Sequence, residues 1–185
     1  LPSMYAFYSG SRSWSINNAF YRKNQYSLDD SEAYFQGKKV FFVRKGGQET
    51  PYFYRNAKGE TKFGVFLDSL VSYRKLQAGV HSEIKIGPGV ASRFWVYNPY
   101  QKAIELQDLR FGLAYTDDFK RTREIQALHP AFQGAGAAML QPGDSLSFGF
   151  RLPAPKKGQP GYLRAVVRHR QMPWGLNGPA QKIGD

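Results

Sequence analysis

Apolar and polar residues alternate along three segments in the second half of the chain, at residues 108–116, 145–152 and 162–170. Such alternation places the apolar side chains on one face of a β-strand and the polar ones on the other. The apolar positions are Leu109, Phe111, Leu113 and Tyr115, then Leu146, Phe148, Phe150 and Leu152, then Leu163, Ala165 and Val167. Turn clusters separate the segments. The pattern predicts antiparallel strands with one buried and one solvated face, as in β-sandwiches.

The first part of the chain has a different pattern, in which a helix signal lies between two apolar runs. Residues 4–8 and 40–43 are short apolar runs that are typical of buried strands. Between them, Ser27 and Asp30 have the spacing of a capping box, and Gly37 stands where a helix would end. Strand, helix and strand in this order predict a βαβ unit, which needs further strands to complete its sheet.

The rest of the chain reads as strands and turns. Tyr52-Phe53-Tyr54 and residues 63–66 flank a turn-forming segment and predict a hairpin. We therefore expect a mainly β fold, with a small α/β (βαβ) segment over residues 1–50. An antiparallel β-sandwich of jelly-roll or Ig-like type is expected over residues 51–185.

Composition limits the chemistry and favours one kind of partner. The chain has 185 residues, no cysteine and a net charge of +12. The lack of cysteine excludes disulfides, thiolate nucleophiles and cysteine-bound metals. The charge favours nucleic acid, a phospholipid surface, or a phosphorylated or acidic glycan. No run approaches the roughly 20 apolar residues that span a bilayer. Leu1-Pro2 is an unusual beginning for a natural protein, so we expect a piece of a longer one.

No motif in the sequence predicts catalysis. His81, His129 and His169 are widely separated and lack metal-binding spacing, so we expect surface or interface histidines and no metal site. Asp29-Asp30 fits helix capping and Asp117-Asp118 fits a turn, which leaves no carboxylate pair assigned to glycoside hydrolysis. Glycine-rich segments match no phosphate-binding or dinucleotide fingerprint. We therefore predict no catalytic residue and no cofactor.

Basic and aromatic residues are interleaved in several segments. The candidate binding residues are Tyr21, Arg22, Lys23, Asn24 and Tyr26 near the N-terminus, and Arg164, Arg168 and Arg170 near the C-terminus. Basic and aromatic side chains together suit nucleic acid, an anionic membrane or a sugar phosphate. No nucleic-acid-binding module is recognised, so nucleic acid is not the expected partner. Because alternation places them opposite Leu163 and Val167, we expect the three arginines to form an exposed ladder.

The first 45 residues resemble part of a known family. The matching segments are Pro2-Ser3-Met4-Tyr5-Ala6-Phe7-Tyr8-Ser9-Gly10, Asn17-Asn18, Tyr21-Arg22-Lys23-Asn24-Gln25-Tyr26 and Gln36-Gly37-Lys38-Lys39-Val40. They are similar to the stretch that follows the last membrane span in large membrane glycosyltransferases of Bacteroidetes-type bacteria, within the dolichyl-phosphate-mannose mannosyltransferase-like superfamily.

The resemblance implies a location and a role. The chain would be a soluble C-terminal accessory domain at the periplasmic face of the inner membrane, without catalytic residues of its own. It would help a polyprenyl-phosphate-sugar-dependent glycosyltransferase to position its lipid or glycan substrate. The implied partners are the transmembrane portion of the same parent, an anionic lipid surface or lipid-linked sugar, and a glycan.

Other functions stay open at this point. A carbohydrate-binding or adhesion β-sandwich is the main alternative, and it needs exposed coplanar aromatic rings. Trp14, Trp95 and Trp174 are the candidates, although Trp95 stands between Phe94 and Val96 and is expected in the core. A nucleic-acid-binding protein and an unrecognised hydrolase are further alternatives.

Overall fold

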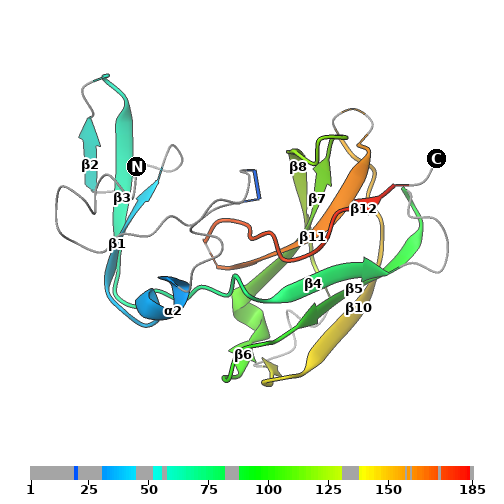
Figure 1. The fold of residues 1–185 in the computed structure, drawn as a ribbon, viewed down its shortest axis with the longest axis horizontal. Coiled ribbons are helices and arrows are strands. Elements are labelled where there is room, and N and C mark those ends of the chain that lie inside the picture. The colour runs from blue at the N-terminus through cyan, green and yellow to red at the C-terminus, as the bar shows by residue number, and fades with distance from the viewer. Residues whose placement is uncertain are drawn as a thin grey trace. The chain divides into compact units, whose positions relative to one another are not determined.

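The computed structural model describes part of the chain as two compact units. The described residues are 19–20, 31–44, 52–55, 58–81, 88–130, 138–156, 158, 160–170 and 172–183. One unit is Asp30–Ser72, and the other combines Leu1–Asp29 with Tyr73–Asp185. Small antiparallel sheets dominate the described part, which confirms the expectation of a mainly β fold (Figure 1). No helix in these ranges is long and apolar enough to cross a membrane.

The described residues of the smaller unit form a three-stranded sheet and one short helix. Its elements are α2 (Ser31–Phe35), β1 (Val40–Arg44), β2 (Tyr52–Arg55) and β3 (Thr61–Leu67). The strand order is β1-β3-β2, and the predicted hairpin is confirmed because Tyr52 pairs with Gly64 and Arg55 with Thr61. Aromatic and β-branched residues fill these strands and favour a pleated sheet.

Only part of the predicted βαβ unit lies within the residues that the structure describes. The helix ends at Phe35 and Gly37 follows it as the predicted terminating residue, with a φ of +72°, a left-handed conformation that glycine adopts without strain. The strand that follows pairs antiparallel with β3, with Phe41 opposite Phe66. The predicted strand at residues 4–8 and the capping residues Ser27 and Asp30 lie outside the described residues.

The described residues of the larger unit form three sheets, in which every strand pair is antiparallel. One sheet has the order β10-β5-β4 and another the order β12-β11-β7-β8. The strands of these two sheets are β4 (Gln77–His81), β5 (Ala91–Tyr97), β10 (Ser145–Arg151), β7 (Leu109–Thr116), β8 (Thr122–Leu128), β11 (Tyr162–His169) and β12 (Gln181–Lys182). A small third sheet pairs β6 (Ile104–Glu105) with β9 (Met139–Leu140) beside the 3-10 helix η2 (Leu106–Asp108).

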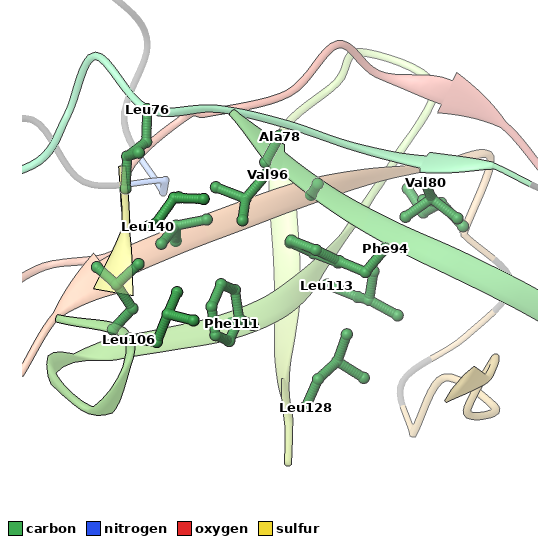
Figure 2. Close-up of a cluster of buried hydrophobic side chains, with 14 of the residues drawn as sticks. Leu76, Ala78, Val80, Phe94, Val96, Leu106, Phe111, Leu113, Leu128 and Leu140 are labelled. Carbon is green, nitrogen blue, oxygen red and sulfur yellow. The ribbon is translucent and has the colours of Figure 1, made fainter. Parts of the chain in front are cut away.

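Side chains from these sheets form one apolar core, as Figure 2 shows. Phe94 of β5 stacks on Phe148 of β10 with ring centroids 5.2 Å apart, and its ring meets Phe111 of β7 edge-on at 5.6 Å. Leu113 and Leu163 are fully buried in the same cluster. The three alternating segments are therefore strands whose apolar faces point inward, as predicted. The jelly-roll or Ig-like type of sandwich stays a prediction.

The opposite face of β7 and β11 is not solvated along its whole length. Ala114 and Val166 are buried there in a second cluster with Ala19, against which Trp174 packs. The backbone N–H of Ala19 donates to the Trp174 carbonyl at 2.7 Å, which ties segments from both ends of the unit over the sheet. This cover explains why the predicted solvated face is half-buried.

Residues 175–178 close the edge between β4 and β11. The Ala78 N–H donates to the Asn177 carbonyl, and the Gly178 N–H donates to the Ala165 carbonyl, both at 3.1 Å. The Asn177 side chain accepts from the Val167 N–H at 2.7 Å. The segment thus binds one strand from each of the two main sheets.

The expected core position of Trp95 is wrong. Its neighbours Phe94 and Val96 are buried, whereas Trp95 is half-buried and points to the other face of β5. The indole lies across Gly79 of β4, where a Cβ atom would stand 2.5 Å from the indole Nε1. Strand alternation therefore overrides the apolar character of the run.

Candidate anion-binding face

The predicted binding residues have different outcomes. Residues 21–26, with Tyr21, Arg22, Lys23, Asn24 and Tyr26, lie outside the described residues. Arg164, Arg168 and Arg170 are described, on β11 or directly after it. Arg164 and Arg168 share the outer face of the sheet, and strand register brings a third arginine to them.

Arg168 lies directly opposite Arg110 of β7 in the strand register. Two like charges facing each other across neighbouring strands destabilise a sheet. The guanidinium of Arg168 stacks on Trp174, with its carbon 4.6 Å from the ring centroid. Such a cation–π contact contributes about 0.5–2 kcal/mol, depending on desolvation. The indole therefore fixes the position of a cation that the sheet alone disfavours.

Arg164 is half-buried and incompletely hydrogen-bonded. It pairs with Ala114 across the sheet, and its Nε is buried without a hydrogen-bond partner among the described residues. Burial lowers the pKa of this guanidinium. The group nevertheless stays charged at neutral pH, because the ordinary pKa of an arginine lies far above neutrality. A buried donor without a partner costs about 1–3 kcal/mol, which makes this position unusual.

The described residues on this face of β11, β7 and β12 include no acidic side chain. They are Tyr162, Arg164, Val166 and Arg168 of β11, Arg110, Gly112, Ala114 and Thr116 of β7, and Lys182 of β12. The Nη1 of Arg110 donates to the carbonyls of Gln107 and Leu109, at 2.6 and 2.8 Å. We call Arg110, Arg164 and Arg168 the arginine face.

The expected exposed ladder is therefore wrong. Arg164 and Arg168 are half-buried because the segment around Trp174 covers part of their sheet face. Arg170 is exposed, but it lies beyond the end of β11 with a φ of +41°. Its Nε and Nη2 donate to the two carboxylate oxygens of Asp108, at 2.9 and 3.1 Å. Arg110 was not among the predicted residues, although it is a polar position of the alternating segment at 108–116.

A second cluster of titratable groups surrounds Asp108. The Nε2 of His169 lies 3.6 Å from its Oδ2, and the His169 ring meets Tyr73 edge-on at 5.5 Å. Partial burial raises the pKa of the Asp108 carboxyl, but the hydrogen bonds and charge of Arg170, with His169, outweigh burial and hold this pKa below its usual value. The histidines were predicted at the surface or at an interface, and His169 does not lie at the surface, because it is buried at the end of β11.

The Asp117-Asp118 pair lies in a turn, as predicted. Asp117 accepts hydrogen bonds from the backbone N–H and the Nε of Arg121, both at 2.9 Å. The Nη2 of Arg123 lies 2.8 Å from the same carboxylate. These contacts stabilise the turn between β7 and β8, in which Lys120 has a φ of +59°. Within the described part of the chain, no group of three or more potential metal ligands occurs.

The described tryptophans lie apart from each other. Trp95 belongs to the sheet β10-β5-β4, and Trp174 covers the outer face of β7, where a Cβ atom at Gly112 would stand 3.1 Å from its ring. Both are half-buried, and Trp14 lies outside the described residues.

Comparison with protein-family models, curated proteins and solved structures finds no match.

Proposed function

We propose that this chain is a non-catalytic accessory domain that binds a phosphate-bearing ligand on the arginine face. The resemblance of its first 45 residues supports a periplasmic position on a membrane glycosyltransferase, with a polyprenyl-phosphate-linked sugar as the ligand. A jelly-roll or Ig-like sandwich would supply the rigid sheet that holds the arginines. The role of the domain is then to position a lipid-linked substrate beside the membrane portion of its parent.

The observation that carries this proposal is the set of unfavourable features on one sheet face. Arg110 and Arg168 face each other across two strands, and the buried Nε of Arg164 has no hydrogen-bond partner in the part of the chain that the structure describes. Each feature lowers the stability of the isolated domain. Local violations of the folding rules concentrate at functional sites, where a ligand supplies the missing interaction.

Phosphate suits the guanidinium groups of the arginine face. Its oxygens accept paired hydrogen bonds from the planar guanidinium fork, and such charge-assisted bonds are about twice as strong as neutral ones. A bound anion would also relieve the repulsion between Arg110 and Arg168. Because Arg164 and Arg168 stand four residues apart on one strand, their Cα atoms are separated by about 13 Å. This spacing suits a diphosphate or a phosphate with a sugar attached better than a single small anion.

The test is titration of the whole chain with inorganic pyrophosphate and with inorganic phosphate, followed by calorimetry at low and high salt. We expect pyrophosphate to bind more tightly than phosphate, and the double variant Arg164→Gln, Arg168→Gln to weaken pyrophosphate binding at least tenfold. Arg151→Gln removes an exposed arginine from the end of β10 and serves as the matched control. Equal loss in the control, or unchanged affinity in the double variant, would contradict the proposal.

A further inference from the structure

We infer a membrane-docking surface in the smaller unit. The outward face of the sheet β1-β3-β2 that carries Phe41 and Phe66 would rest on the interfacial region of an anionic phospholipid bilayer. This inference goes beyond ligand binding by the arginine face and is carried by different residues. A separate experiment tests it.

Large apolar side chains gather on this face in register. Phe41 lies opposite Phe66, while Val43 and Tyr52 both pair with Gly64 of the central strand. We call Phe41, Val43, Tyr52 and Phe66 the aromatic face. Each of the four side chains is 45% to 50% exposed. Half-exposed aromatic side chains in register are uncommon on a solvated surface and indicate an interaction site.

The aromatic face is packed into a continuous layer. The Phe41 and Phe66 ring centroids lie 4.8 Å apart, Tyr52 and Phe66 lie 5.1 Å apart, and Phe41 and Tyr52 lie 6.3 Å apart. The Phe41 ring lies over Gly64, where any Cβ atom would collide with it. Glycine thus allows the ring to lie across the sheet instead of standing upright. A layer of this form matches a planar surface better than it matches a concave pocket.

The charges of the same unit complement an anionic surface. Residues 30–72 contain seven lysines and arginines and five carboxylates, and Glu32 among the carboxylates is buried. The cations are Lys38, Lys39, Arg44, Lys45, Arg55, Lys58 and Lys62. Tyrosine and other amphipathic rings favour the headgroup level of a bilayer. Each lysine or arginine near an anionic leaflet adds about fivefold to binding, and salt weakens this effect.

A second copy of the chain is a weaker candidate for the occupant. A half-exposed phenylalanine or tyrosine offers about 100 Å² of surface. The three rings of the aromatic face therefore offer about 300 Å² and Val43 adds less than one ring does, so the face reaches less than half of the roughly 800 Å² that each partner contributes to a stable protein interface. A bilayer sets no such minimum, because shallow insertion of a few rings is strengthened by the charges around them.

The first test is co-sedimentation of the whole chain with vesicles of phosphatidylcholine alone, and with vesicles that also contain phosphatidylglycerol. We expect salt-sensitive binding to the anionic vesicles. The double variant Tyr52→Ser, Phe66→Ser should lower this binding at least tenfold. Phe119→Ser is the matched control, because it removes an even more exposed phenylalanine from the turn between β7 and β8. Circular dichroism checks that each variant keeps its sheets.

A second measurement tests insertion without removing the aromatic face. In Tyr52→Trp, the new indole should shift its emission to shorter wavelength on anionic vesicles and be quenched by lipids brominated high on the acyl chain. No quenching, or equal binding by the double variant and the parent chain, would overturn the inference. So would self-association that the double variant abolishes while vesicles stay unbound. The double variant should still bind pyrophosphate, which separates this inference from the proposed function.

Discussion

At the scale of single residues, Asp108 joins the end of β11 to the 3-10 helix η2. It accepts two hydrogen bonds from Arg170, and its own backbone carbonyl accepts the Arg170 N–H at 2.8 Å. The pKa of the carboxyl is lowered in the folded chain. A carboxyl with a lowered folded pKa stabilises the fold above its unfolded pKa, and this contribution is lost as the pH falls through the folded pKa.

Asp108→Asn should therefore lower the free energy of unfolding at neutral pH and have little effect in acid. We expect a loss of about 0.5–1 kcal/mol, because the Arg170 partner is largely exposed and solvent screens the pair. As the pH falls through the lowered pKa of the folded parent chain, its carboxyl is protonated and the difference between the two proteins should shrink. Urea unfolding of the variant and the parent chain over a pH series measures the difference in their free energy of unfolding at each pH. A difference that stays constant down to acid pH would show that packing, not charge, sets the effect.

At the scale of elements, the segment at residues 175–178 is expected to be sensitive to one added methyl group. Gly178 packs against the Ala78 carbonyl of β4 and the Ala165 side chain of β11, so a Cβ atom there would collide with backbone. Backbone cannot move aside as a flexible side chain can. Gly178→Ala should lower the free energy of unfolding by about 2–4 kcal/mol. Gly149→Ala is the control, because a Cβ atom there meets nothing within 4 Å, and it should change stability by less than about 1 kcal/mol.

The strands could be predicted from the sequence, but the segment around Trp174 that covers one face of β7 and β11 could not. Alternation predicted that Leu163 and Val167 point inward, because side chains of a strand alternate between its two faces. By the same alternation Val166 lies on the face of Arg164 and Arg168, and it is buried there in the cluster against which Trp174 packs. Residues around Trp174 have no periodicity that indicates a partner. Which face they cover is decided by contacts between segments far apart in the sequence.

The candidate site shows the same division. Arg164 and Arg168 were predicted because they are basic and lie on one face of one strand. Arg110 lies beside them only because of the register of β7 with β11. Arg170 does not belong to the arginine face, because its side chain binds Asp108. A single sequence contains neither the register of two strands nor the identity of an ion-pair partner. Pairing rather than propensity therefore determines the site.

At the scale of the whole molecule, the two units differ in how much apolar surface they bury. The core of the larger unit unites buried side chains from strands of its three sheets, including Phe94, Phe111 and Leu113. The described sheet of the smaller unit keeps Phe41, Phe53 and Phe66 about half or more exposed. Regions with little buried apolar surface open more readily than a well-packed core. We expect amide hydrogens of β1 to β3 to exchange faster than those of β7 and β11.

Substitution in one core tests whether the units unfold separately. Leu113→Ala creates a cavity in the larger unit and should cost about 3–5 kcal/mol. Exchange limited by global opening of that unit should then accelerate at least about 100-fold, since 1.4 kcal/mol is tenfold. If the units are independent, amides of β1 to β3 keep the rates of the parent chain. Leu70→Ala in the smaller unit should give the reverse pattern, because Leu70 is buried there and its carbonyl accepts the Gly37 N–H at 2.8 Å. Hydrogen-exchange mass spectrometry reads both units in one experiment, and acceleration of both by either variant would show that they unfold as one.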